Sequence, residues 1–254
     1  MVMTIDIGNT NIVVGAYRDD NLLFSARLAT ERARTDFQYA AELDSILRMY
    51  SLREEICEVA AISCVVPPLL PTIRSAIQML LHCRVMAVGP GVKTGLNIRI
   101  DNPSILGADL VCGAVAAVRK YGAPCIVIDM GTATKISAID RQGSFIGCSI
   151  MPGIGVSLDA LSSNTAQLPF IDIAKAGTVI GTNSVDSMRS GIIYGSAAMI
   201  DGMLERYRER LGRDAAVVAT GGFAPHIIPY CREEILVDPQ LILDGLLDIC
   251  KRNQ

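Results

Sequence analysis

The stretch MTIDIGNTN, residues 3–11, sets an apolar run directly against a group of small polar residues. Its first half has the apolar and β-branched composition of a buried strand, yet the carboxylate of Asp6 stands one residue before this run ends. Gly8 then permits a tight turn, and the three residues after it carry amide or hydroxyl groups. This order predicts a strand that ends in a polar turn and continues into a second strand.

The same order returns in IVIDMGTAT, residues 126–134, where Asp129 takes the place of Asp6. One repeat at so long a spacing indicates a duplicated domain rather than a solenoid. In both halves, strand-like segments are followed by alternating helical and strand-like segments, so we expect an α/β fold with two mixed sheets covered by helices. The duplication divides the chain into domains at residues 1–120 and 121–254.

Each aspartate–glycine turn has two interpretations. In an ordinary tight turn, Asp and Asn side chains bond to their own backbone. In a phosphate-binding hairpin, glycine lets the backbone approach phosphate oxygens, N–H and hydroxyl groups donate to them, and the carboxylate holds hydrated Mg²⁺. Two copies at equivalent positions favour the second interpretation, with a nucleotide clamped in a cleft between the domains. The sequence has no GxxxxGK[ST] pattern and therefore no P-loop.

A third glycine turn follows the strand expected over residues 215–220. Gly221 and Gly222 would let the backbone approach a flat or anionic ligand. If this glycine pair is considered by itself, an ordinary turn is its simpler interpretation. Its meaning depends on the two aspartate–glycine turns.

Composition excludes several classes of function. The 254 residues are 50% hydrophobic and 19% charged, which suits a packed core, and the net charge of −3 gives no basic surface for nucleic acid or an anionic membrane. No apolar run reaches the ~18–20 residues of a membrane span, and the N-terminus lacks the basic region of a signal peptide. Eight scattered cysteines and two histidines show no metal-ligand spacing. We therefore expect a cytoplasmic protein with reduced cysteines and with no nucleic-acid or membrane partner.

Taken in order, these motifs resemble those of the acetate and sugar kinase, Hsp70 and actin superfamily, and within it the chain resembles type III pantothenate kinases nearly end to end. Each glycine turn is unspecific by itself, but the order and spacing of the turns are specific. The matching stretches are residues 6–11, 34–39, 107–109, 129–134, 152–154, 165–169, 187–191 and 219–222. The resemblance implies two duplicated ribonuclease H-like domains with a nucleotide cleft between them. The first would hold one phosphate loop and the catalytic aspartate, and the second the other phosphate loop and the adenosine-side loop.

The resemblance also implies an activity, the ATP-dependent phosphorylation of the primary hydroxyl of pantothenate to 4′-phosphopantothenate, which is the first step of coenzyme A biosynthesis. ATP would be the phosphoryl donor, and Mg²⁺ with a monovalent cation, K⁺ or NH₄⁺, would be the cofactors. A second copy of the chain would be the protein partner, in a homodimer with the substrate pocket near its interface.

The resemblance assigns roles to residues by position. Asp109 corresponds to the proton acceptor, Asp129 to a ligand of the monovalent cation, and Asp6 to a carboxylate near Mg²⁺ and phosphate. The implied ATP and phosphate contacts are Asp6, Ile7, Gly8, Asn9, Thr10, Asn11, Ile12, Val13, Gly131, Thr132, Gly221 and Gly222. The implied substrate contacts are Ile100, Gly107, Ala108, Asp109, Leu110 and Ser184.

From the residues alone, Asp109 also has a structural interpretation. It lies in a loop that leads to a helix expected over residues 110–119, and a carboxylate near a helix N-terminus stabilises that helix. Phosphoryl transfer needs in-line positioning, neutralisation of phosphate charge and a base for the hydroxyl proton. Only the resemblance assigns that base to Asp109.

The sequence departs from the family pattern at two substrate positions. Leu110 stands where the family usually has Arg, and Ile100 where it usually has Tyr, while Ser184 keeps the hydroxyl of the usual Thr. A buried polar substrate loses roughly 1–3 kcal/mol for each missing hydrogen bond. These departures leave open an alternative function, that of a non-catalytic or altered-substrate nucleotide-binding paralogue acting through a protein partner. An assembly ATPase such as Hsp70 or actin is disfavoured, because the chain has no room for their additional subdomains.

Overall fold

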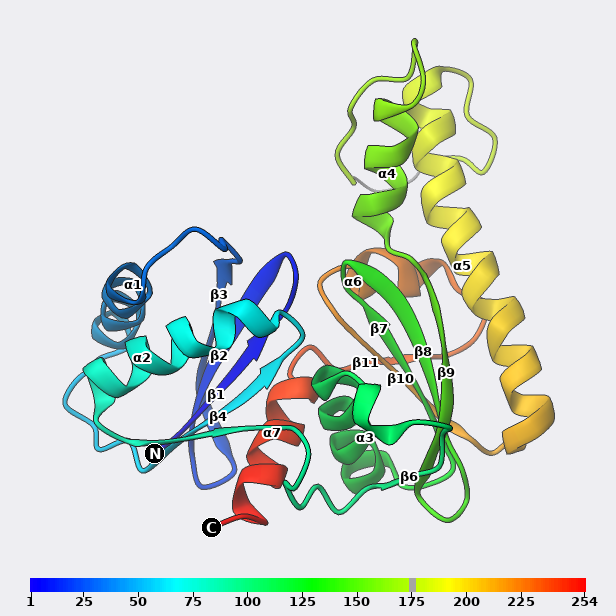
Figure 1. The fold of residues 1–254 in the computed structure, drawn as a ribbon. Coiled ribbons are helices and arrows are strands. Elements are labelled where there is room, and N and C mark those ends of the chain that lie inside the picture. The colour runs from blue at the N-terminus through cyan, green and yellow to red at the C-terminus, as the bar shows by residue number, and fades with distance from the viewer. Residues whose placement is uncertain (174–176) are drawn as a thin grey trace. The chain divides into compact units, whose positions relative to one another are not determined.

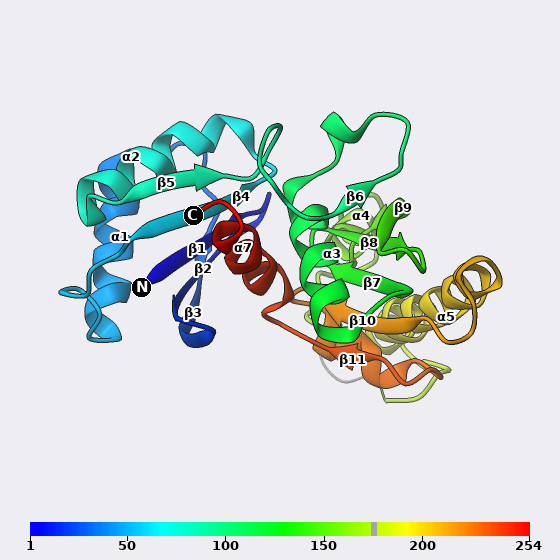
Figure 2. The ribbon, with the colours of Figure 1, turned by 90° about the horizontal axis from the view of Figure 1, so that it is seen from below.

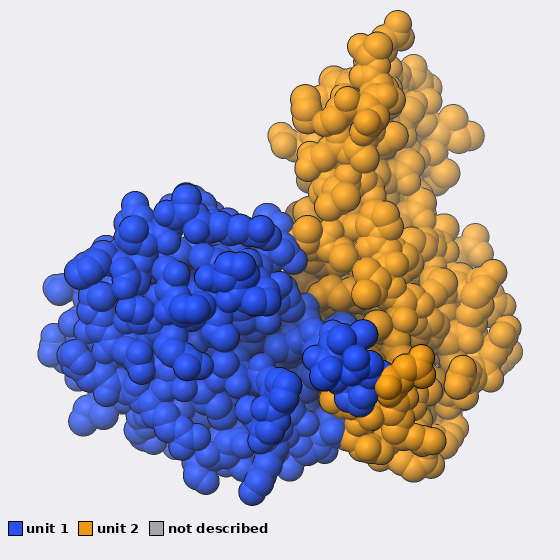
Figure 3. All heavy atoms as spheres, in the orientation of Figure 1, with its two compact units in different colours: residues 1–96, 102–116, 240–254 blue, residues 97–101, 117–239 orange. Residues whose placement is uncertain are grey.

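The structure is a computed structural model that describes residues 1–173 and 177–254. The chain forms two compact units, which Figure 3 shows in different colours. Unit 1 contains residues 1–96, 102–116 and 240–254, and unit 2 contains residues 97–101 and 117–239. Residues 240–254 therefore group with the beginning of the chain, whereas the continuous domains expected from the sequence place them in the second half.

Unit 1 contains a five-stranded mixed sheet in the order β3-β2-β1-β4-β5 (Figure 1). Strands β1, β2 and β3 form an antiparallel meander, and β4 and β5 continue the sheet parallel to β1. The strands span Val2–Ile7, Asn11–Arg18, Asn21–Ala29, Val59–Cys64 and Arg84–Ala87. Met3, Ile5 and Ile7 of β1 belong to the apolar core, and because side chains alternate along a strand, Asp6 faces the other side of the sheet.

Two helices cover the core face of this sheet. They are α1 (Asp36–Met49) and α2 (Leu70–Leu81), which follows a 3₁₀ turn at Pro67–Leu69. Thr35 caps α1 by accepting a hydrogen bond from the backbone N–H of Gln38. Buried side chains from both helices join the apolar core of the sheet.

The opposite face of the sheet packs against α7 (Leu241–Lys251), which lies beside β1, β2 and β4 (Figure 2). Two glycines make this contact close. A Cβ atom on Gly15 of β2 would lie 2.9 Å from Leu243 Cδ1, and a Cβ atom on Gly245 would lie 1.9 Å from the carbonyl oxygen of Cys112 in α3 (Ala108–Tyr121). The backbones of α7 and α3 are therefore in direct contact, which a larger residue at position 245 would prevent.

Unit 2 contains a six-stranded mixed sheet in the order β11-β10-β7-β8-β9-β6. Strands β7, β8 and β9 form an antiparallel meander, β10 and β11 continue parallel to β7, and β6 pairs with β9. In chain order from β6, the strands span Asn97–Ile98, Cys125–Met130, Ala133–Ile139, Ser144–Pro152, Ala216–Thr220 and Leu236–Val237.

The helices of unit 2 pack on one face of its sheet and extend beyond it. The long helix α5 (Ser184–Leu211), α4 (Ile154–Ser163) and the short α6 (Ala224–Ile227) bury apolar side chains against Ile126, Ile128 and Met130 of β7. The α4 helix and the first turns of α5 lie beyond the ends of the strands, on the side where β9 ends (Figure 1). Short 3₁₀ turns occur at Pro103–Ile105 in unit 1 and at Ile228–Tyr230 in unit 2.

The two sheets confirm the predicted duplication and the α/β class. If β7 to β11 replace β1 to β5, the strand order of unit 2 is that of unit 1, except that β6 is added beside β9. Asp6 and Asp129 occupy the same place, one residue before the end of the central strand of each sheet. Within residues 1–173 and 177–254, none of the helices combines the length and apolar composition of a bilayer-spanning segment.

Candidate phosphoryl-transfer site

The predicted first phosphate loop connects β1 to β2 in unit 1. The backbone N–H of Gly8 donates to Asn11 O over 3.0 Å, and Thr30 Oγ1 donates to Gly8 O over 2.7 Å. Asn9 and Thr10 are exposed at the tip. The backbone of this predicted loop is therefore fixed at its base, while its amide and hydroxyl side chains lie at the surface.

The other predicted contacts of this loop differ in what they can offer a ligand. Ile7 and Ile12 are buried in the core, so that only their backbone groups could reach a phosphate. Val13 lies directly opposite Asp6 in the antiparallel pair of β1 and β2. An apolar residue therefore stands across the hairpin from the first aspartate.

Asp6 and Asp109 lie near the same buried thiol, that of Cys112. Asp6 pairs with Ser63 across β1 and β4, and its Oδ1 atom is buried. Asp109 is 8% exposed in the first turn of α3, and Cys112 follows one turn later. Burial, and then the charges of Asp6 and Asp109, raise the pKa of the Cys112 thiol well above its usual range, while the Ser63 hydroxyl beside it lowers that pKa in part. The structure thus brings the two predicted carboxylates of unit 1 together around a neutral thiol.

The helix that carries Asp109 begins earlier than the sequence indicated. Helix α3 starts at Ala108 rather than at Leu110, so Asp109 lies inside the first turn and not in the preceding loop. Its Oδ1 atom accepts a hydrogen bond from Leu110 N over 2.8 Å, and a Cβ atom on Gly107 would lie 2.5 Å from the same oxygen. Gly107 therefore makes room for the carboxylate, which satisfies the helix terminus as the structural interpretation expected.

The predicted second phosphate loop, in unit 2, is packed between two other glycine turns. A Cβ atom on Gly153 would lie 2.3 Å from Thr132 O, and a Cβ atom on Gly221 would lie 2.6 Å from Met130 O. Gly221 also has a φ angle of +92°, a conformation that favours glycine. The structure thus brings together the predicted residues Gly131, Thr132, Gly221 and Gly222 at the ends of β7 and β10.

Asp129 is ion-paired within unit 2. It lies opposite Lys135 in the antiparallel pair of β7 and β8, and the distance from Lys135 Nζ to Asp129 Oδ2 is 2.7 Å. The Lys135 side chain is 16% exposed and the Asp129 side chain 13%, so that the pair is largely out of water. An ammonium group therefore stands where the family resemblance implies a monovalent cation.

The residues around Asp129 do not fit a second positive charge. Two unit charges ~4 Å apart repel each other by about 4 kcal/mol at an effective dielectric constant of about 20. A K⁺ or NH₄⁺ ion on Asp129 would meet this repulsion from the Lys135 ammonium, which already contacts the carboxylate. The sequence analysis did not single out Lys135, because its meaning depends on the pairing of β7 with β8 rather than on a motif.

The surroundings of Asp6 fit Mg²⁺ held mainly by a nucleotide. Among the residues described, no cluster of three or more His, Cys, Asp or Glu side chains could hold a metal ion. Mg²⁺ in kinase sites usually takes one or two carboxylates and completes its shell with substrate phosphates and water. Asp6, beside the exposed polar loop of residues 8–11, offers such a carboxylate.

The predicted substrate contacts are divided between separate parts of the structure. Gly107, Ala108 and Leu110 surround Asp109 at the start of α3 in unit 1. Ile100 follows the edge strand β6 in unit 2, whereas Ser184 begins α5, at the end of unit 2 near α4 (Figure 1). Ser184 lines a cavity of about 670 Å³ together with residues such as Leu161, Leu168 and Met188. Within unit 2, Ile100 and Ser184 are therefore not brought together.

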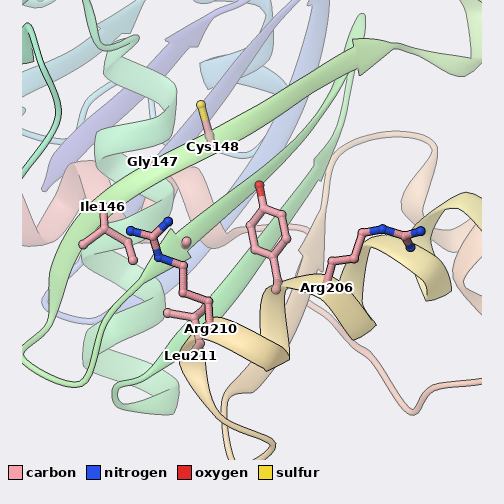
Figure 4. Close-up of a pocket in the computed structure, with 8 residues that line it drawn as sticks. Ile146, Gly147, Cys148, Arg206, Arg210 and Leu211 are labelled. Atoms are coloured by element: carbon pink, nitrogen blue, oxygen red, sulfur yellow. The ribbon is translucent and has the colours of Figure 1, made fainter.

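A second cavity, of about 310 Å³, lies between β8, β9 and the C-terminal part of α5 (Figure 4). Arg206 and Arg210 extend from one side and Cys148 lies on the other. Its eight lining residues include none of the predicted site residues. This cavity is thus separate from the candidate site.

Comparison with known proteins identifies the family. The family model described as type III pantothenate kinase matches residues 2–206. The chain belongs to the type III pantothenate kinase family. It is 41% identical over 253 residues to the type III pantothenate kinase of Halalkalibacterium halodurans and 42% identical over 254 residues to that of Exiguobacterium sibiricum, in both cases over 100% of each chain.

A solved structure agrees with this family assignment at the level of the fold. The activator of the 2-hydroxyisocaproyl-CoA dehydratase from Clostridium difficile, solved with bound ADPNP, has a TM-score of 0.59 to this chain. The alignment covers 99% of this chain and 95% of that one at 12% identity, so the likeness concerns the fold alone. As a member of the type III pantothenate kinase family, the chain is a kinase.

Sequence reasoning missed three residues of the candidate site. Cys112 and Ser63 lie beside the carboxylates of unit 1, and Gly153 packs on the second phosphate loop. Of these, only Gly153 left a signal, since the Pro152–Gly153 turn is among the stretches that resemble the family. The two others are ordinary apolar-strand and helix residues until the fold places them next to Asp6 and Asp109.

Proposed function

We propose that this chain transfers the γ-phosphoryl group of ATP to the primary hydroxyl of pantothenate, giving 4′-phosphopantothenate and ADP at the start of coenzyme A biosynthesis. The observation that supports it most strongly is the convergence of Asp6 and Asp109 on one buried thiol in a chain of this family. Asp6 can then hold the cation that binds the phosphates, and Asp109 can accept the proton of the acceptor hydroxyl.

Asp109 is the proposed base. It accepts the proton of the pantothenate hydroxyl while the hydroxyl oxygen forms a bond to the γ-phosphorus and the bond from that phosphorus to the bridging oxygen of ADP breaks. Gly107 leaves space for the carboxylate, and the Leu110 N–H holds one of its oxygens.

The two glycine hairpins are the proposed ATP contacts. Asn9 and Thr10 present exposed side-chain donors in unit 1, and the hydroxyl of Thr132 does so in unit 2, where the N–H of Gly131 donates to Ala133 O within the turn. Gly221 and Gly222 end β10 beside the second loop and are proposed to lie against the adenosine side of the nucleotide. Mg²⁺, when bound, would neutralise phosphate charge, and Asp6 is proposed to hold it together with the phosphates.

The second copy of the chain is proposed to pack on the α4–α5 region of unit 2. Apolar side chains are exposed there, with Phe170 76% and Ile180 81% accessible, around the cavity that Ser184 lines. Exposed apolar patches of this kind mark association surfaces. Light scattering coupled to size exclusion should give a dimer mass for the full chain and a monomer mass for Ile180→Asp, whereas Ile56→Asp, at an equally exposed isoleucine of unit 1, should remain dimeric.

The decisive experiment is an assay of the purified chain with ATP, Mg²⁺, KCl and pantothenate, in which mass spectrometry detects 4′-phosphopantothenate. Product in an amount equal to the ADP released supports the proposal. Absence of product, with ATP binding intact by calorimetry, would support the alternative of a nucleotide-binding paralogue.

That alternative is favoured by the two departures from the family pattern, Leu110 and Ile100. The variant Leu110→Arg restores the usual arginine and so tests the first of these two departures by itself. If Leu110 limits the use of pantothenate, the variant should lower KM for pantothenate by about tenfold, the effect of one hydrogen bond of roughly 1.4 kcal/mol. An unchanged KM would show that other residues already compensate for the missing arginine.

A further inference from the structure

We infer that the Lys135 ammonium takes the place of the monovalent cation at Asp129, so that this chain catalyses phosphoryl transfer without K⁺ or NH₄⁺. The inference rests on the proposed function, because Gly131 and Thr132, which follow Asp129, are taken there as contacts of ATP. The family resemblance implies K⁺ or NH₄⁺ at Asp129, whereas in this chain Lys135 already pairs with that carboxylate.

The position of Lys135 is fixed by the sheet. It is the residue directly across from Asp129 in the β7–β8 pair, and it lies on the same face of the sheet as Asp129 because directly paired residues share a face. Its neighbours Thr134 and Ile136 are buried on the core face. The side chain of Lys135 is thus directed at the carboxylate by strand register.

The contact itself is that of a tight, poorly hydrated ion pair. Nζ of Lys135 lies 2.7 Å from Oδ2 of Asp129, and both side chains are less than one-fifth exposed. The other carboxylate oxygen, Oδ1, lies on the side of Gly131, where a Cβ atom would be 3.6 Å away. One oxygen therefore receives the lysine while the other faces the phosphate loop.

The net charge at Asp129 is consistent with the Lys135 ammonium replacing a monovalent cation, and not with a cation bound in addition to it. An ammonium group is a compact unit positive charge with three donors, and it binds the same oxygen ligands as NH₄⁺. Asp129 with Lys135 has the same net charge as a carboxylate with one bound K⁺. The second phosphate loop consequently experiences the same balance of charge without an ion from solution.

The wild-type chain gives the first test. At constant ionic strength, the rate of phosphoryl transfer and the affinity for a non-hydrolysable ATP analogue should each differ by less than about twofold between KCl, NH₄Cl and tetramethylammonium chloride. A rate at least about tenfold higher in KCl than in tetramethylammonium chloride would overturn the inference.

The variant Lys135→Met should create a cation requirement. Because it leaves Asp129 without its partner, the melting temperature in tetramethylammonium chloride should fall by about 5 °C, and KCl or NH₄Cl should restore much of this loss. This measurement needs neither ATP nor pantothenate, so it remains decisive even if pantothenate is not the acceptor. The same melting temperature in all three salts would overturn the inference, since no ion would then occupy the place of the ammonium.

Two further variants serve as controls for Lys135→Met. Lys120→Met removes the lysine of another partly buried pair in unit 2, Lys120–Asp238, and its melting temperature should fall equally in all three salts. Lys135→Arg retains the positive charge, so its melting temperature should not respond to K⁺, and it can be measured even if Lys135→Met fails to fold. A K⁺-dependent rise in Lys135→Arg would contradict the inference.

Discussion

The two phosphate hairpins have the same backbone plan but differ in the charge opposite their aspartates. In unit 1, Asp6 faces Val13 across the hairpin and lies near Ser63 and the Cys112 thiol. In unit 2, Asp129 faces Lys135 and forms a 2.7 Å ion pair with it. The residue directly across the hairpin is thus apolar in one half and, in the other, a lysine that pairs with the carboxylate.

The difference indicates a division of labour after duplication. A carboxylate that is to bind Mg²⁺ with phosphate must keep its negative charge available, and a lysine directly opposite would compete for that charge. A carboxylate that only shapes a loop can be neutralised permanently by a cross-strand lysine. One cross-strand residue in each hairpin therefore distinguishes the two proposed roles, that of a magnesium ligand for Asp6 and that of a permanently neutralised carboxylate for Asp129.

The largest expected effect concerns Asp109, the proposed base in unit 1. Asp109→Asn should lower kcat by about 10²–10⁴-fold, the usual contribution of general base catalysis, and change the ATP dissociation constant little. Steady-state kinetics and calorimetry measure the two effects separately. Asp101→Asn, at an exposed aspartate earlier in the same segment, is the matched control and should retain kcat. Full activity in Asp109→Asn would remove this residue from its proposed role.

The second prediction compares the packing of the two loops. Gly153→Ala would place a Cβ atom 2.3 Å from Thr132 O, whereas Gly8→Ala would place one 2.9 Å from Asn11 O. Overpacking against backbone atoms costs about 1–3 kcal/mol, so Gly153→Ala should lie at the upper end of this range and Gly8→Ala near its lower end. Urea denaturation of both variants measures the free energy of unfolding. Equal losses would show that the second loop is no more tightly enclosed than the first.

The third prediction transfers the lysine from one hairpin to the other. Val13→Lys places an ammonium opposite Asp6, as Lys135 lies opposite Asp129. Its pairing with Asp6 should compete with Mg²⁺ and lower kcat/KM by about 10–100-fold, which corresponds to one charged hydrogen bond of roughly 1.5–3 kcal/mol. Higher Mg²⁺ should recover part of this loss, and Val13→Met is the uncharged control. If Val13→Lys keeps full activity, the contrast between the two hairpins has no functional meaning.

The smallest effect is expected at Cys112. Its thiol pKa is raised in the folded chain by burial and by the two nearby carboxylates, so the thiol stays neutral through the range in which a free thiol ionises. The contribution of this thiol to the stability of the folded chain is therefore complete below the pKa of the thiol in the unfolded chain, about 8.5. It is lost as pH rises toward the higher pKa of the thiol in the folded chain. Cys112→Ser should therefore lose less stability than wild type between about pH 8 and pH 10. Its kcat at neutral pH should remain within about threefold of wild type, because the serine keeps a small neutral group there.

The two hairpins and the duplicated sheets could be predicted from the sequence, because their signals are local. The strand, aspartate and glycine order defined both hairpins, and the repeat of that order predicted two related sheets. The ion pair of Asp129 could not be foreseen, since it depends on the number of residues in the turn between β7 and β8, which sets their register. The convergence of Asp6 and Asp109 is also non-local, because it requires Cys112 in the first turns of α3 to reach Ser63 of β4, which pairs with Asp6.

The contact of α7 with the rest of unit 1 has a consequence for the synthesis of the chain. Residues 240–254 complete unit 1 through the Gly245–Cys112 contact and through packing on β1, β2 and β4, yet the ribosome synthesises them only after all of unit 2. Contacts between segments so distant in sequence form late. The nascent half that carries Asp6 and Asp109 must therefore remain unfinished, with one face of its sheet uncovered, until translation has passed residue 240.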